Sequence, residues 1–238
     1  MLNKIDVVIS CLFFQRPQAK MSLTMNKDFI RTLVLNTRTK KNIKCVFTFN
    51  AVTDWYYDEL IKEIDKYLTL KEQTVIRRSV MNMKFSRSHN YAIQMFDSKY
   101  VCLVNDDIEI PESSHLWLEQ CLSFLDSNDK IGTVTPVTVY PNNTFYCAGA
   151  SGNGAHFLQY QNDGKGVFDK PRRTEWNNMS CILIKKKLFD EYGLFLTDIN
   201  HEHFHSDREW CTRISKEGGY EHWVHPVRLI HKHKYGYN

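Results

Sequence analysis

The chain has 238 residues, of which 42% are hydrophobic and 24% charged, a composition that predicts a substantial core and excludes a disordered protein. Its formal net charge of +4 suits an anionic ligand such as a nucleotide, but it is too small to indicate nucleic-acid binding. The seven cysteines form no C-x-x-C pair, which is typical of reduced thiols in a cytoplasmic protein. No apolar run approaches the roughly 20 residues of a transmembrane helix, so we expect no stable membrane insertion.

Strand and helix signals alternate along the first half of the chain. Short runs of β-type apolar residues predict strands, and apolar residues at helical spacing predict helices. This alternation favours an α/β fold with a mostly parallel sheet flanked by helices, in which ligands bind at the carboxyl ends of the strands. The predicted order is strand 5–12, helix 27–37, strand 44–49, helix 57–67, strand 73–77, helix 86–96 and strand 100–104.

The second half of the chain is less regular. Its residues 141–178 are rich in Asn, Gly and aromatic residues and show little periodicity, which is typical of a functional or mobile segment. The predicted elements are helix 116–125, strand 132–139, strand 180–184, helix 186–192, helix 206–216 and strand 228–231.

The most informative pattern is an apolar strand that ends in Asn105-Asp106-Asp107. Adjacent carboxylates at the end of a buried strand are unfavourable unless a cation lies beside them. A divalent cation, Mg²⁺ or Mn²⁺, binds carboxylate oxygens and keeps substrate phosphates as further ligands. The alternative is a surface turn, where Asn and Asp are common. Glu109, two residues further on, is expected to face away from such a site.

Two other junctions between a predicted strand and a predicted helix carry polar side chains. Asn50 and Asp54 can hydrogen-bond a nucleotide base or ribose, or they can belong to an ordinary turn with Thr53 or Asp54 as the helix N-cap. Arg87 lies at the start of a helix, where backbone N–H groups and a guanidinium suit a diphosphate. The alternative for Arg87 is a solvated first turn.

The helix 206–216 opens with two carboxylates. Asp207 and Glu209 are two residues apart, so on a helix their side chains point roughly 200° from one another. One can act as a general base on a substrate hydroxyl, while the other can pair with Arg213. Both could instead stabilise the helix dipole. In the last predicted strand, His231 can complete a metal site or lie on the surface.

In this order the motifs closely resemble glycosyltransferase family 2, whose members are nucleotide-sugar-dependent inverting enzymes of the GT-A fold. Two departures stand out: Asn50 replaces an aspartate that contacts the base, and Ser206 and Glu209 replace two acidic residues of the catalytic motif. The segments that carry the resemblance are Val7–Pro17, Phe47–Asp54, Phe85–Ile93, Val104–Glu109, Lys187–Phe195, Asp207–Arg213 and Gly219–His231.

The resemblance implies one GT-A domain over residues 1–238. In such a domain, about residues 1–110 form the nucleotide-sugar-binding half, and about residues 111–238 form the acceptor-binding and catalytic half. The acceptor is expected at residues 141–178, with Trp176 among the binding residues, and at the loop before the last helix.

The resemblance also implies roles for single residues. Asp107 and His231 would hold Mn²⁺ or Mg²⁺, and Asp207 would be the general base, with Glu209 as the second candidate. The residues implied in donor binding are Arg16, Asn50, Asp54, Arg87, Asn90 and Asp106.

The implied function is transfer of a sugar from a nucleotide-diphosphate sugar, with UDP-sugars favoured, to a hydroxyl of a glycan or glycoconjugate in the cytoplasm. One alternative is a sugar-nucleotide pyrophosphorylase. Such enzymes usually carry a Gly-rich signature after the first strand, and Cys11–Pro17 contains no Gly. The other alternative is a non-catalytic relic that binds a sugar nucleotide, although the retained acidic residues and His231 argue against it.

Overall fold

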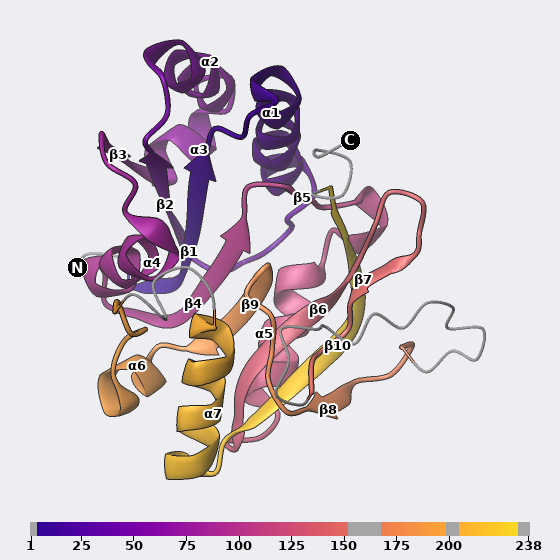
Figure 1. Cartoon of the computed structure of the whole chain (residues 1–238). Coiled ribbons are helices and arrows are strands. Elements are labelled where there is room, and N and C mark those ends of the chain that lie inside the picture. The colour runs from indigo at the N-terminus through magenta and orange to yellow at the C-terminus, as the bar shows by residue number, and fades with distance from the viewer. Residues whose placement is uncertain (1–3, 152–167, 199–204, 233–238) are drawn as a thin grey trace.

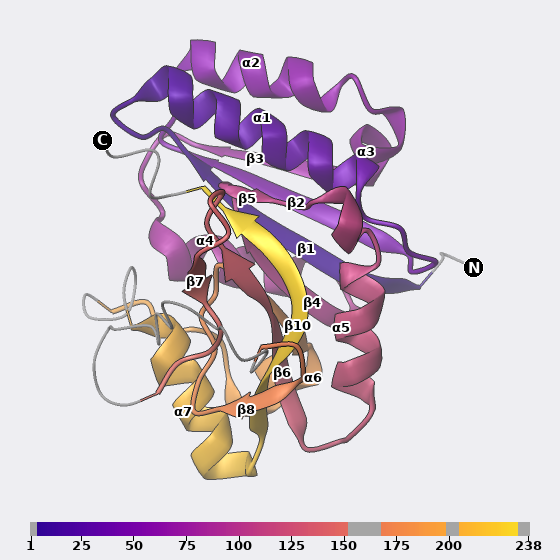
Figure 2. The same ribbon diagram turned by 90° about the vertical axis from the view of Figure 1, so that its right-hand side faces the viewer.

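The computed structural model describes residues 4–151, 168–198 and 205–232. Within them, one sheet runs through the molecule and helices pack on both of its faces (Figures 1 and 2). The strands are β1 (Ile5–Phe14), β2 (Ile43–Asn50), β3 (Thr74–Ser79), β4 (Ser98–Asn105), β5 (Ile108–Glu109), β6 (Ile131–Val139), β7 (Phe145–Cys147), β8 (Arg172–Thr174), β9 (Cys181–Lys185) and β10 (Glu221–His231). The helices are α1 (Ala19–Leu35), α2 (Asp54–Ile64), α3 (Leu68–Gln73), α4 (Lys84–Met95), α5 (Trp117–Asp126), α6 (Lys187–Tyr192) and α7 (Ser206–Gly218), with a 3₁₀ turn η1 (Glu112–Ser114).

The strand order is β3-β2-β1-β4-β9-β6-β10-β5, with β7 added to β6 and β8 to β10. The long strands β3, β2, β1 and β4 pair in parallel, and β6 pairs in parallel with β10. β9 runs antiparallel between β4 and β6. The predicted α/β fold with a mostly parallel sheet is therefore confirmed, and β9 joins its two parallel parts.

Alternate residues of β1 belong to different cores, because successive side chains of a strand point to opposite faces. Val7, Ile9, Cys11 and Phe13 pack in the core that α1, α2 and α5 also line. Val8 packs on the other face with Ala92 of α4. In Figure 2, α1 and α2 lie above the sheet and α4 lies below it. Within the described part of the chain, no helix has the length and apolar character needed to cross a bilayer.

Two elements begin earlier than the sequence pattern predicts. Helix α1 starts at Ala19 rather than at residue 27, because Ser22 and Asn26 are polar residues on its buried face and hide the amphipathic pattern. Strand β10 starts at Glu221 rather than at residue 228, because Pro226 interrupts the strand signal where the pairing with β6 shifts register. The short elements α3, β5, β7 and β8 were not predicted.

Two buried histidines are held neutral inside the fold. The Nδ1 atom of His89 lies 2.8 Å from the Ser10 hydroxyl, and burial lowers the pKa of His89 to about 3. The Nε2 atom of His222 donates to the carbonyl of Cys211 at 2.9 Å, and burial lowers its pKa to about 4. Both values lie below the usual 6.5. The unfolded chain therefore binds more protons than the native protein between about pH 4 and 6.5.

We expect the free energy of unfolding to fall as the pH drops from 6.5 to 5, by close to 1.4 kcal/mol per pH unit for each histidine. Urea titrations at pH 7, 6 and 5 measure this slope. In His222→Gln, whose amide can still donate to the Cys211 carbonyl, the slope should be about halved. A stability that is constant from pH 7 to 5 would contradict the neutral, buried state of both rings.

Candidate active site

A pocket of about 660 Å³ lies at the carboxyl ends of β2, β1 and β4. Parallel strands bring the residues that follow them to one edge of the sheet, so side chains distant in sequence meet here. The lining residues are Leu12, Phe14, Gln15, Arg16, Asn50, Ala51, Asn82, Phe85, Asn105, Asp106, Asp107, Tyr146 and His231.

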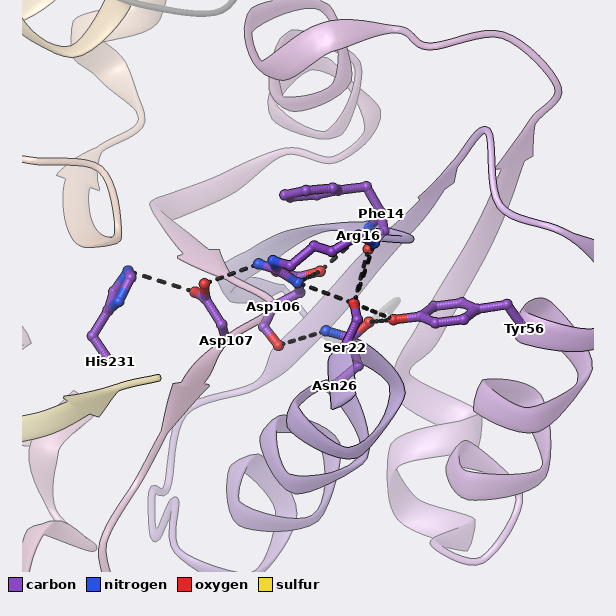
Figure 3. Close-up of polar contacts among 8 residues, drawn as sticks. All are labelled: Phe14, Arg16, Ser22, Asn26, Tyr56, Asp106, Asp107 and His231. Atoms are coloured by element: carbon purple, nitrogen blue, oxygen red, sulfur yellow. Dashed lines mark hydrogen bonds and ion pairs between the residues drawn. The ribbon is translucent and has the colours of Figure 1, made fainter. Parts of the chain in front are cut away.

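A buried ion cluster forms the floor of this pocket (Figure 3). The Arg16 Nη2 atom lies 2.7 Å from Asp106 Oδ1 and 2.9 Å from Asp107 Oδ2, and Nη1 lies 3.2 Å from Asp106 Oδ2. One guanidinium therefore bridges two carboxylates. The sequence placed all three residues near the ligand but did not predict this contact. The available signal was the pair of carboxylates, which requires a nearby cation.

Three residues that the sequence analysis missed hold the cluster in place. The Asn26 amide donates to the backbone carbonyl of Asp106 at 2.9 Å, and the Tyr56 hydroxyl donates to Asn26 Oδ1 at 2.6 Å. The Ser22 hydroxyl lies 2.7 Å from that of Tyr56 and accepts from Arg16 Nη1 at 3.4 Å. Helices α1 and α2 thus fix the end of β4 through the polar residues that obscured the start of α1.

Burial and charge act in opposite directions on this cluster. Burial raises the pKa of Asp106, and the Arg16 guanidinium acts to lower it. Burial acts to lower the pKa of Arg16, but Asp106 and Asp107 more than offset this and raise it. The guanidinium therefore remains charged, and with two ionised carboxylates the cluster carries one net negative charge. That charge favours a further cation beside Asp107.

Asp107 and His231 lie side by side at the edge of the pocket. His231 Nε2 is 3.5 Å from Asp107 Oδ1, both side chains are buried, and the imidazole stacks on the Tyr146 ring with 4.0 Å between centroids. A carboxylate oxygen beside an imidazole nitrogen suits Mn²⁺ or Mg²⁺ when phosphate and water oxygens complete the coordination. The described residues contain no larger group of metal-ligating side chains. The pair therefore fits a metal that is shared with an anionic ligand.

Glu109 points away from this site, as predicted. It forms an ion pair with Lys232 and is absent from the residues that line the pocket.

The two carboxylates of α7 have different surroundings. Glu209 Oε1 lies 2.9 Å from Arg213 Nε, which confirms the predicted pair. Arg213 also donates to the carbonyls of Tyr192, at 2.5 Å, and Leu194, at 2.9 Å. Glu209 is thus part of a structural link between α7 and the segment after α6.

Asp207 is partly buried, and its carboxylate accepts from the backbone N–H of Arg208 at 2.8 Å. Burial raises the pKa of Asp207, which brings it closer to the range useful for a general base. Burial also raises the pKa of Tyr146, and the charges of Asp107 and Asp207 add to that rise. Tyr146 lines the pocket, so Asp207 lies within electrostatic reach of the pocket wall.

Asn50 and Asp54 are separated by the structure. Asn50 is buried and lines the pocket, where its amide donates to Asn82 Oδ1 at 2.7 Å and accepts from the Met83 N–H at 2.6 Å. Asp54 is exposed at the start of α2 and does not line the pocket, and the Thr53 hydroxyl caps that helix. The turn alternative therefore describes the position of Asp54.

Three other predicted site residues also lie outside the pocket lining. Arg87 is exposed, and its guanidinium lies 3.5 Å from the Thr197 carbonyl. Asn90 is buried, donates to the Phe195 carbonyl at 2.8 Å and accepts from the Phe195 N–H at 3.1 Å. Trp176 is buried in the core between the sheet and α7. Their roles in binding stay predictions.

The segments expected to bind the acceptor are described only in part. Residues 152–167 and 199–204 lie outside the described residues.

The fold and site define a GT-A glycosyltransferase domain. Three solved structures share the fold: a mannosyltransferase, PcManGT, from Pyrobaculum calidifontis (12% identity, TM-score 0.64), GalNAc-T7 (13%, 0.70) and S. aureus TarS 1–349 (10%, 0.63). The matches cover 96%, 98% and 98% of this chain but 57%, 44% and 62% of those chains, in the same order. The chain thus spans about half the length of these structures.

The family model described as Glycosyl transferase family 2 matches residues 27–193, and the chain belongs to this family. No curated protein matches the sequence.

Proposed function

We propose that the protein is a metal-dependent inverting glycosyltransferase. It would transfer a sugar from a nucleotide-diphosphate sugar, with UDP-sugars favoured, to a hydroxyl of a glycan or glycoconjugate. The observation that carries the proposal is the pocket in which the ion cluster, Asp107 and His231 meet at the ends of parallel strands. PcManGT, solved with GDP-Man and Mn²⁺, and GalNAc-T7, solved with UDP, GalNAc and Mn²⁺, support a nucleotide and a divalent cation as ligands.

In this proposal, Asp107 and His231 hold Mn²⁺ or Mg²⁺ beside the diphosphate. When bound, the cation stabilises the negative charge that develops on the leaving nucleotide. Arg16 orients both carboxylates, and Asp106 keeps Arg16 in place through the bidentate contact. The floor of the pocket is therefore preorganised before ligands arrive, which limits the rearrangement needed for catalysis.

Asp207 is the proposed general base. It takes the proton from the acceptor hydroxyl, whose oxygen forms a bond to the anomeric carbon. The bond between that carbon and the phosphate oxygen breaks on the opposite face, and the nucleotide diphosphate leaves with the electron pair. A single displacement of this kind inverts the anomeric configuration.

The proposed cellular location is the cytoplasm. All seven cysteines are buried and free, as expected for reduced thiols.

Replacing Asp107 with Asn should remove most of the metal dependence of nucleotide binding. The substitution keeps the side-chain volume but removes the charge that attracts the cation, so we expect Mn²⁺ to lose at least about tenfold of its effect on UDP affinity. Calorimetric titration of UDP at increasing Mn²⁺ concentrations measures this effect.

Glu109→Gln is the matched control, because Glu109 is a nearby carboxylate that points away from the pocket. Its Mn²⁺ dependence should equal that of the wild type. Full Mn²⁺ dependence in Asp107→Asn would show that the metal binds elsewhere.

A further inference from the structure

Three amide side chains line the end of the pocket nearest β2 and β3: Gln15, Asn50 and Asn82. Backbone N–H groups fix the orientation of two of them. Asn82 Oδ1 accepts from the Lys84 N–H at 2.9 Å, and Asn50 Oδ1 accepts from the Met83 N–H at 2.6 Å. A backbone N–H can only donate, so the atom that accepts from it must be the amide oxygen.

The third amide is oriented in the same way. Gln15 Oε1 accepts from the backbone N–H of Thr53 at 3.1 Å and from its hydroxyl at 2.9 Å. The Asn50 amide uses one of its N–H groups on Asn82 Oδ1 at 2.7 Å. The oxygens of all three amides are thus engaged within the protein. What they leave for a ligand is a set of N–H donors, without a side-chain acceptor among them.

These amides lie apart from the ion cluster along the edge of the sheet. In the strand order, β2 and β4 flank β1, so their ends are two strand spacings apart, or about 10 Å. Gln15 contacts the loop after β2, whereas Arg16, the next residue, contacts Asp106 after β4. Phe14 and Phe85 add aromatic surface to the same pocket. The pocket therefore has an ionic end for a diphosphate and an amide end for a flat heterocycle.

We propose that Gln15, Asn50 and Asn82 form a donor-only recognition set that selects uracil over bases that carry an amino group. Uracil presents two carbonyl oxygens and no exocyclic amino group. Cytosine, adenine and guanine each present an amino group, which would meet an N–H donor and leave both groups unpaired. This inference rests on the proposed function, because it assumes that a nucleotide occupies the pocket.

The expected selectivity follows from the penalty for an unpaired buried polar group. One such mismatch weakens binding by about tenfold or more. With Mn²⁺ present, we expect the wild-type protein to bind UDP at least about tenfold more tightly than CDP, ADP or GDP in calorimetric titrations.

Asn82→Asp tests the inference directly. One carboxylate oxygen can keep the bonds to Lys84 and Asn50, while the other replaces the N–H groups with an acceptor. We expect the ratio of UDP affinity to CDP affinity to fall by about tenfold. The added charge cancels from this ratio, because UDP and CDP carry the same diphosphate.

Two further variants complete the test. Asn82→Ala removes the donors without adding an acceptor and should reduce the ratio by a smaller factor. Gln15→Glu should shift the ratio in the same direction as Asn82→Asp, and it provides a second test if that variant does not fold. Thermal melting checks that each variant is folded.

The results separate this inference from the proposed function. Preference for UDP, reduced in both acidic variants, supports it. UDP binding with equal affinity for the other three nucleotides, or an unchanged ratio in both folded variants, overturns the donor-only set and leaves the proposed function standing. Failure of all four nucleotides to bind with Mn²⁺ overturns both.

Discussion

Asp207→Asn should lose sugar transfer by a factor of about 10² to 10⁴ while it keeps nucleotide and metal binding. The amide has nearly the same shape and can still accept from the Arg208 N–H, but it cannot take a proton from the acceptor. Because burial raises the pKa of Asp207, we also expect the acidic limb of the wild-type rate profile to lie above the usual carboxyl range. Transfer assays across pH, with UDP titrations in parallel, measure both effects.

Glu209→Gln is the control for this result. Glu209 opens the same helix, but its carboxylate is paired with Arg213. We expect its transfer rate to stay within about tenfold of the wild type and any loss to appear as lower stability. If Glu209→Gln abolished transfer and Asp207→Asn did not, the roles of the two residues would be reversed.

Arg16→Met should destabilise the protein by about 3–5 kcal/mol at pH 7, because it leaves two buried carboxylates without their counter-ion. Without the guanidinium, the pKa of the native carboxyls rises further above the unfolded value. The native state then binds more protons than the unfolded chain, so the defect should shrink as the pH falls toward 5. Urea unfolding at pH 7 and 5 measures the difference.

Two comparisons make this prediction specific. Arg87→Met removes an exposed guanidinium and should change stability by less than about 0.5 kcal/mol. Mn²⁺ should raise the melting temperature of Arg16→Met more than that of the wild type, because the cation replaces part of the lost charge. A loss below about 1 kcal/mol at pH 7 would show that the cluster in Figure 3 contributes little to the folded state.

The sequence predicted the fold class because long apolar strands and amphipathic helices alternate in the first half of the chain. It also predicted the place of the site, since polar residues follow β2 and β4 at one edge of the sheet. The structure brings Arg16, Asn50, Asp106, Asp107 and His231 into one pocket. Their roles remain predictions.

Contacts that depend on side-chain packing could not be read from the sequence. Arg16 bridges carboxylates about 90 positions away, and Ser22 and Asn26 look like surface residues until α1 is seen to bury them. Asp54 and Trp176 have the residue types expected at such a site, but one caps the surface end of a helix and the other fills the core. Residue type alone does not distinguish these positions.

The central claim is that this pocket binds a nucleotide-diphosphate sugar with the help of a divalent cation. Calorimetric titration of the wild-type protein with a panel of nucleotide sugars, with and without Mn²⁺, tests it most directly. We predict that at least one sugar nucleotide binds with Mn²⁺, that its affinity falls without the metal, and that the bound donor is slowly hydrolysed to the nucleoside diphosphate. Binding that is indifferent to the metal, with no hydrolysis, would indicate a non-catalytic relic. Conversion of a nucleoside triphosphate and a sugar phosphate into pyrophosphate would indicate a pyrophosphorylase, and either result would contradict the proposed function.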